Sequence, residues 1–383
     1  MKKFEFILFV VFLLFCAVMM NSWATETRVF SMGNSGVFMN DNSNILYFPG
    51  NVMRFGNEIV TELRLKDNEE LFSAEVRLPI NSHMFGLNFN RPINIYNPGV
   101  GTNIRLEQTS DLYFGTKIGG NDLGVRFSLG RDGYSQDSTA VQPRLEESAR
   151  YLEIAGGYST DNFDVSLGLE LPSIKSERQG NKDEYGGNNI WINGRYFYQY
   201  NSEIKFVPVL QLSFGSADRK TDIGPGIPQA ETDYSLTNMN LGIGLNYQLT
   251  ENSLLVLGID PFGQSTTKEK EKEGDESTVV TSTLPRLYLG AEANIKSWLS
   301  GRIGANKAYQ TITTKIKPYQ QDEIKRTVHQ SPYNVSFGLG LKLGRFLIDL
   351  DINDGFFFEG PNFMSGRFRD FSNRVSVSYL FSK

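Results

Sequence analysis

The sequence predicts an all-β fold: a transmembrane antiparallel β-barrel of about sixteen strands, with fourteen strands as the alternative. Residues 1–24 have the form of a secretory leader, and segments that alternate apolar and polar residues recur from residue 58 to the C-terminus. After the leader, no stretch reaches the ~20 continuous apolar residues that a membrane helix requires. Because only helices and closed barrels satisfy every backbone hydrogen bond within hydrocarbon, these strands are expected to close into a barrel.

The leader is predicted from its three parts. Lys2 and Lys3 make the start basic, residues 7–20 are apolar, and Ser22 and Ala24 are small residues at the −3 and −1 positions of a cleavage site. The processed chain is therefore expected to begin near Thr25. The single cysteine of the chain lies within the leader, so no disulfide and no thiolate metal site is expected afterwards.

Sixteen segments show the period-two alternation of strands with two unlike faces. They are residues 58–65, 71–78, 83–90, 110–118, 122–130, 150–158, 162–170, 189–200, 203–214, 236–248, 253–260, 284–294, 299–307, 333–343, 345–353 and 374–381. Turns of a few residues alternate with loops of about twenty, which is typical of bacterial outer-membrane barrels with short periplasmic turns and long external loops. An even strand count places both termini on the periplasmic side.

Aromatic residues gather near the predicted periplasmic turns, as expected for a girdle at the lipid headgroups. They are Tyr158, Phe163, Tyr198, Tyr200, Phe206, Tyr247, Trp298, Phe346, Tyr379 and Phe381. Residues 374–381 resemble the closing strand that the outer-membrane assembly machinery recognises. The partners predicted on this basis are outer-membrane lipid and that machinery, and the predicted location is the outer membrane.

Charged residues of both signs occupy the polar, inward positions of the strands. The candidates are Arg126, Glu153, Asp164, Glu170, Arg195, Lys205, Glu292, Arg302, Lys342, Asp349 and Asp351. Mixed signs favour paired networks that hold a plug, because an ion-selective pore carries rings of one sign. Inward glycines, such as Gly168, Gly242, Gly244, Gly338 and Gly340, leave room either for a plug or for a ligand passage.

Composition and motifs argue against other classes of protein. A chain with 38 basic and 43 acidic residues and no basic cluster is a poor partner for nucleic acid. Two distant histidines, His83 and His329, do not form a transition-metal site, and no cofactor is expected. His329 is expected in a long external loop, so no catalytic triad is predicted. Residues 266–277, rich in Lys and Glu, are expected to be a mobile loop tip.

The residues before the first strand resemble the opening of the long-chain fatty-acid transporter (FadL-like) barrels and the related type IX secretion shuttle barrels. The similar features are the Met32-Gly33-Asn34-Ser35-Gly36 turn, the acidic Asp41, and Phe48-Pro49-Gly50 where the family has Asn-Pro-Ala. The resemblance implies that residues 25–57 fold into the barrel as a plug, or hatch, ahead of a barrel over residues 58–383. The plug candidates are Met32, Gly33, Gly36, Asp41, Asn44 and Pro49.

The last candidate site residues are aromatic residues in a predicted external loop: Phe356, Phe357, Phe358 and Phe363. They are expected either to pack over the barrel mouth or to form the entrance for a hydrophobic ligand. The leading hypothesis is passive uptake of a hydrophobic small molecule by a barrel that is not an enzyme. The alternatives are a barrel that binds a partner such as a secreted protein, and a non-selective or structural porin-like barrel.

Overall fold

The computed structural model describes residues 25–66, 69–93, 95–96, 99–100, 103–104, 106–138, 144–222, 229–272, 274–352 and 372–381. The predicted leader and Phe356, Phe357, Phe358 and Phe363 lie outside these ranges. The strands are β1 (Glu58–Lys66), β2 (Glu69–Ile80), β3 (His83–Pro92), β4 (Gln108–Ile118), β5 (Asn121–Gln136), β6 (Leu145–Ser159), β7 (Phe163–Arg178), β8 (Asn181–Tyr196), β9 (Tyr198–Gln199), β10 (Ile204–Asp222), β11 (Ala230–Thr250), β12 (Ser253–Glu271), β13 (Glu276–Lys296), β14 (Leu299–Lys317), β15 (Ile324–Gln330), β16 (Tyr333–Leu343), β17 (Phe346–Ile352) and β18 (Ser372–Leu380).

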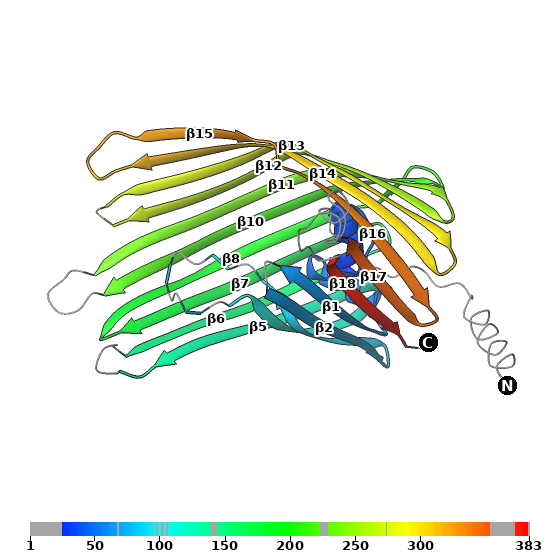
Figure 1. The fold of residues 1–383 in the computed structure, drawn as a ribbon, viewed down its shortest axis with the longest axis horizontal. Coiled ribbons are helices and arrows are strands. Elements are labelled where there is room, and N and C mark those ends of the chain that lie inside the picture. Colours follow the sequence, from blue (N-terminus) through cyan, green and yellow to red (C-terminus); the bar gives the residue numbers. More distant parts are fainter. Residues whose placement is uncertain are drawn as a thin grey trace, which may run out of the picture.

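The strands form a closed antiparallel barrel, as the sequence predicts (Figure 1). The first and last strands close it, because β1 pairs with β18 from Glu58↔Leu380 to Arg64↔Arg374. Two wall strands are interrupted: β8 and β9 both pair with β10, and β15 and β16 both pair with β14. Counting each interrupted strand once gives the sixteen predicted strands, and each predicted range overlaps one of them.

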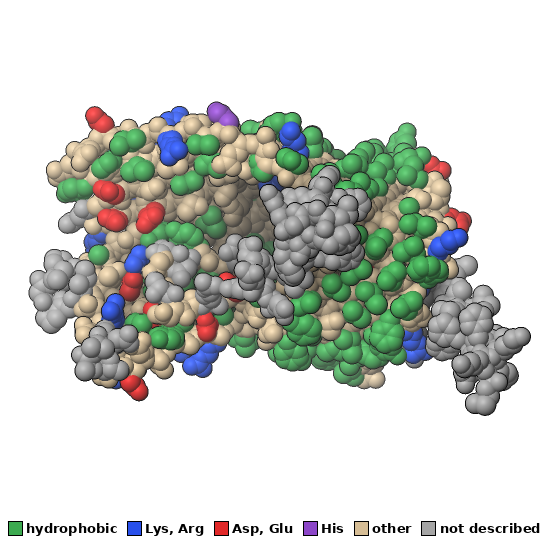
Figure 2. All heavy atoms as spheres, in the orientation of Figure 1, with side chains coloured by type: hydrophobic (Ala, Val, Ile, Leu, Met, Phe, Trp, Pro, Cys, Tyr) green, Lys and Arg blue, Asp and Glu red, His purple; other side chains and the backbone are tan. Residues whose placement is uncertain are grey.

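The outer face of the barrel carries an apolar belt. In β4, for example, Asp111 and Tyr113 are buried inside, whereas Leu112 and Phe114 between them are 55% and 38% exposed on the outside. Figure 2 shows hydrophobic side chains gathered around the end of the barrel where the short turns lie. An apolar outer band on a closed barrel meets lipid, so this is an outer-membrane barrel.

Aromatic rings do gather at the end of the barrel that carries the short turns. Rings of Tyr158 and Phe163 lie 6.0 Å apart, and those of Phe346 and Tyr379 lie 4.9 Å apart. The short turn between β6 and β7 separates the first pair, and the second pair lies on neighbouring strands β17 and β18. None of the helices among the described residues is long and apolar enough to cross a membrane.

The wall is much taller on one side than on the other. Strands β16, β17, β18 and β1 to β4 have 7 to 12 residues, close to the ~9–11 that a membrane-spanning strand needs. Strands β10 to β14 have 19 to 21 residues. At ~3.3 Å per residue, these strands extend roughly 30 Å past the short ones.

The tall side forms an open half-cylinder outside the membrane, here named the external trough. It runs from residues 130–136 of β5 to β15, and both rims are free: residues 130–136 pair only with β6, and β15 pairs only with β14 in the described ladder. Figure 1 shows the long strands running past the short ones, and Figure 2 shows the hollow between the rims at the border of the apolar belt.

Three expectations about external loops are wrong because strands continue where loops were predicted. A long loop was expected between the predicted strands 162–170 and 189–200. Instead, a two-residue turn at Gln179 and Gly180, both with positive φ, joins β7 to β8. Residues 266–271 belong to β12, and His329 belongs to β15. A strand outside the membrane has water on both faces, so it lacks the apolar alternation that identifies a half-buried strand.

The segment before β1, residues 25–57, lies inside the barrel. It consists of α2 (Glu26–Ser31) and three 3₁₀ turns: η1 (Ser35–Phe38), η2 (Asn42–Leu46) and η3 (Pro49–Met53). Thr25 caps α2 by accepting a hydrogen bond from the Arg28 backbone N–H. The elements contact strands on opposite sides of the wall, such as β17 for α2 and β5 for η3, so the segment crosses the lumen.

Candidate functional site

Buried ion pairs join the start of the segment 25–57 to the wall. The Arg28 guanidinium donates to both carboxylate oxygens of Glu292 on β13, each at 2.7 Å, and to Asp41 at 2.9 Å. Arg302 on β14 bridges Glu292 and Asp349, and Asp349 accepts a hydrogen bond from Thr25 at 2.9 Å. These charge-assisted contacts fix α2 against β13, β14 and β17.

A second group of ion pairs holds the end of the segment against the opposite wall. Arg54 donates to Asp122 at 3.1 Å, and its Nη1 lies 3.6 Å from Asp164. Arg195 pairs with Asp164 at 2.7 Å and also donates to the backbone carbonyl of Met39 at 2.7 Å. The segment is therefore anchored by ions on both sides of the lumen.

Wall glycines receive the segment at its closest approaches. A side chain at Gly304 would meet the backbone of Met32 and Gly33, and one at Gly124 would meet the backbone of Pro49. Phe38 fills the space at the predicted inward glycines Gly242 and Gly244, and at Gly258. The space beside these wall glycines is therefore occupied by the segment 25–57.

The predicted plug candidates all lie within this packed interior. Met32 and Asp41 are fully buried, and Asn44 donates to the Met39 carbonyl at 2.7 Å. Gly33 has φ +69°, and Gly36 packs against Val29. Burial raises the pKa of the Asp41 carboxyl, and the neighbouring Arg28 opposes that rise.

The predicted inward charges lie on the inner face, and most of them are paired. Arg126 pairs with Glu153, Arg195 with Asp164, and Arg302 with Glu292 and Asp349. Glu170 accepts from Asn189 at 3.0 Å, Asp351 accepts from Asn373 at 3.3 Å, Lys205 lies over the Phe197 ring, and Lys342 is half-buried.

Sequence reasoning missed Arg28, Arg54 and Arg91 as members of these networks. The sequence feature that could have identified them is the position of each arginine: Arg28 and Arg54 lie in the predicted plug, and Arg91 lies at the end of a strand.

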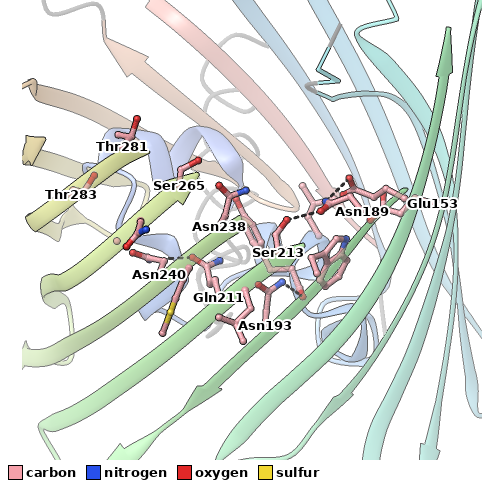
Figure 3. A pocket seen from close by; sticks show the side chains of 18 of the residues that line it. Glu153, Asn189, Asn193, Gln211, Ser213, Asn238, Asn240, Ser265, Thr281 and Thr283 are labelled. Carbon is pink, nitrogen blue, oxygen red and sulfur yellow. Dashed lines mark hydrogen bonds between the residues drawn. The ribbon is translucent and has the colours of Figure 1, made fainter. Parts of the chain in front are cut away.

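Above the segment, on the external side, the lumen contains a chamber of about 620 Å³. Its floor is Leu46 and Tyr47. Wall side chains hold this floor by hydrogen bonds to its backbone carbonyls. Arg126 donates to Leu46 O at 2.5 Å, and Ser166 donates to Tyr47 O at 2.5 Å. The walls carry amide and hydroxyl side chains from neighbouring strands, including Asn193, Gln211, Ser213, Asn238, Asn240, Ser265, Thr281 and Thr283 (Figure 3).

A second cavity of about 440 Å³, the tyrosine pocket, continues from the chamber into the external trough, since both are lined by Tyr151, Asn189 and Asn238. Three of its tyrosine rings, those of Tyr96, Tyr185 and Tyr234, have centroids 5.7 to 6.3 Å apart. Burial raises the pKa of the Tyr96 hydroxyl, so this group is a neutral donor at physiological pH.

The connection between β3 and β4 brings Tyr96 into the trough. Val100 and Ile104 of this connection are buried against the inner face of β6, β7, β8, β10 and β11. The inward-folded loop was not predicted, because residues 93–107 show no periodic pattern.

The histidines take part in strand contacts. His83 Nδ1 lies 2.9 Å from Thr116 Oγ1, and His329 Nδ1 lies 3.1 Å from Thr311 Oγ1. Across the described ranges, no three His, Cys, Asp or Glu side chains are grouped so as to hold a metal ion.

No protein-family model and no curated protein matches the sequence. Among solved structures, the chain is similar to a Pseudomonas aeruginosa FadL homologue at TM-score 0.46 and 9% identity, over 95% of this chain and 99% of that chain. It is similar to the CymD monoaromatic hydrocarbon channel at TM-score 0.41 and 10% identity, over 93% and 97% of the two chains. For the Pseudomonas putida toluene transporter TodX the values are 0.36 and 10%, over 94% and 96%. The function proposed below rests on this chain's own residues.

Proposed function

We propose that the protein takes up a small amphipathic molecule passively across the outer membrane. One observation carries this proposal: a chamber continuous with the external trough ends on a segment that packs inside the barrel without being part of its wall. A lumen that is open to one side and closed by a separate segment suits regulated passage. A purely structural barrel needs neither feature.

The arrangement of cavities suggests the route. A molecule would enter from the external trough, contact the rings of Tyr96, Tyr185 and Tyr234, and move into the chamber above Tyr47. It would pass the floor when residues 46–47 shift. Along this route the molecule meets aromatic rings first and hydrogen-bonding groups second, which suits a molecule with an apolar part and polar groups. The substrate class predicted from the sequence, a hydrophobic small molecule, is therefore narrowed to an amphipathic small molecule.

Uptake into liposomes tests the proposal. Purified barrel would be reconstituted with a fluorescent fatty acid outside, in parallel with a radiolabelled aryl glycoside, and compared with a variant lacking residues 25–57 and with protein-free liposomes. We expect saturable uptake of at least one probe by the complete protein, and faster uptake without saturation by the truncated variant. Uptake equal to that of protein-free liposomes in both variants, with both probes, would overturn the proposal.

The second candidate is the binding of a partner protein at the external trough. The rims favour it, because β15 pairs only with β14 among the described strands, and its other edge can accept an added strand. Charge reversal at Lys325 and Arg326 would abolish binding to a partner that docks there and leave small-molecule uptake unchanged.

A further inference from the structure

Strand register aligns amide and hydroxyl side chains into two neighbouring rows on the inner wall. One row is Asn193↔Gln211↔Asn240↔Gly263↔Thr283↔Gln310, from β8 through β14. The other row, one inward position further out, is Ser213↔Asn238↔Ser265↔Thr281. These residues are here named the amide band. At ~4.8 Å per strand, the longer row spans roughly 24 Å of the chamber wall.

Much of the hydrogen-bonding capacity of the amide band faces the chamber. Asn240 donates to Gln211 at 3.4 Å, and Ser213 donates to Asn189 at 2.7 Å (Figure 3). In the described part of the chain, five side chains of the band make no side-chain hydrogen bond: Asn238, Ser265, Thr281, Thr283 and Gln310. Each presents donors or acceptors to whatever occupies the chamber.

The amide band is uncharged, and this separates it from the charged groups beside it. Charged groups also line the chamber: Arg91 and Arg126 both pair with Glu153, and Arg91 pairs with Asp111 as well, whereas Glu170 accepts from Asn189 at 3.0 Å and Arg286 donates to Tyr288 at 3.4 Å. A ligand that relied on a charge at Arg91, Arg126 or Glu153 would have to break these buried pairs. A ligand with several neutral hydroxyl groups can instead donate to and accept from amides and hydroxyls directly.

Aromatic faces stand beside the amide band. The tyrosine pocket contacts the band at Ser213 and Asn238, so one molecule can reach the rings of Tyr185 and Tyr234 and the band together. Sugar rings have apolar C–H faces and polar edges, which suit aromatic rings on one side and amides on the other.

We propose that the amide band and the tyrosine pocket together bind a neutral saccharide, either free or as a glycosyl group of the transported molecule. The inference deepens the proposed function, because it concerns the same chamber. The two fail separately: uptake of the fatty acid without saccharide binding would overturn only this inference, and saccharide binding without uptake of any probe would overturn only the proposed function.

Trp191 provides the binding assay, since it lines the chamber. The chain has three tryptophans, of which Trp23 lies in the predicted leader and Trp298 lies in the short turn between β13 and β14. In the processed protein, Trp298→Phe leaves Trp191 as the only tryptophan. Its fluorescence would be titrated with neutral di- and trisaccharides of glucose, galactose, mannose and N-acetylglucosamine, with decanoate as the charged amphiphile, and with dextran as the polymer.

Variants of the band test the assignment. Asn238→Leu with Asn240→Leu, and separately the isosteric Thr283→Val, remove hydrogen-bonding groups from the chamber wall. We expect Kd for the best saccharide to rise about tenfold in the double variant, as follows from the loss of two ligand hydrogen bonds. Thr237→Val is the matched control, because Thr237 is exposed on the outer face of the same strand; its Kd should be unchanged.

Binding of short saccharides alone supports a free sugar or glycoside, and additional binding of dextran supports capture of a surface polysaccharide. No response to any saccharide, a response to decanoate only, or equal Kd in the band variants and in wild type would overturn the inference. Heat-modifiable migration on a denaturing gel would verify that each variant forms the barrel.

Discussion

Replacing Arg28 by Ala is expected to release the segment 25–57 from the barrel wall. Arg28 is 5% exposed and holds two carboxylates, those of Glu292 and Asp41. Without it, Glu292 keeps Arg302, but the fully buried Asp41 keeps only its hydrogen bonds from Ser43. Removing one partner of a buried pair costs about 3–5 kcal/mol. At about 1.4 kcal/mol per factor of ten, the released fraction rises roughly a hundredfold to several thousandfold.

Two measurements would report the release. Trypsin should cleave after Arg54, whose side chain is 17% exposed in the docked segment, and conductance across planar bilayers should rise. Arg28→Ala with Asp41→Asn should restore part of the protection, because the uncompensated charge is then gone. Lys315→Ala is the control, since it removes only an exposed pair with Glu323, worth at most about 1 kcal/mol. Conductance and trypsin resistance equal to wild type in Arg28→Ala would refute the reasoning.

Three further changes probe the wall, the belt and the tyrosine pocket. Gly304→Val should displace the backbone of Gly33 and raise bilayer conductance, whereas Gly194→Val meets open space and should leave conductance unchanged. Leu112→Arg on the apolar belt should lower the free energy of unfolding in liposomes by about 2–4 kcal/mol, measured by denaturant titration; a change below 0.5 kcal/mol would argue against lipid at that face. Tyr234→Ala should slow liposome uptake severalfold by removing one ring of the tyrosine pocket, and an unchanged rate would exclude that pocket from the route.

Within the membrane, the sequence was sufficient to predict the strands. Lipid on one face and a polar interior on the other force alternation, as at Asp111-Leu112-Tyr113-Phe114, where the buried and exposed side chains take turns. Outside the membrane this constraint ends. Residues 266–271 and His329 therefore read as loops although they belong to β12 and β15.

The candidate site was predictable only in part. Alternation predicts that Glu292 and Arg302 point inward, but Arg28, the other partner of Glu292, is 264 residues away in the sequence and nothing local pairs the two. The amide band was out of reach for a similar reason. Asn240 and Thr283 are ordinary polar positions of two strands, and only the register through Gly263 places them in one row.

The contacts of the segment 25–57 also indicate which part moves if a molecule passes. Its two ends are held by buried ion pairs through Arg28 and Arg54, and moving either end away from the wall breaks those pairs. The floor at residues 46–47 is held by hydrogen bonds to its carbonyls, and Arg126, which makes one of them, keeps Glu153 when the floor leaves. Moving the floor therefore costs less than moving either anchor. Passage by displacement of residues 46–47, with both ends still bound to the wall, is the lowest-cost route that this structure offers.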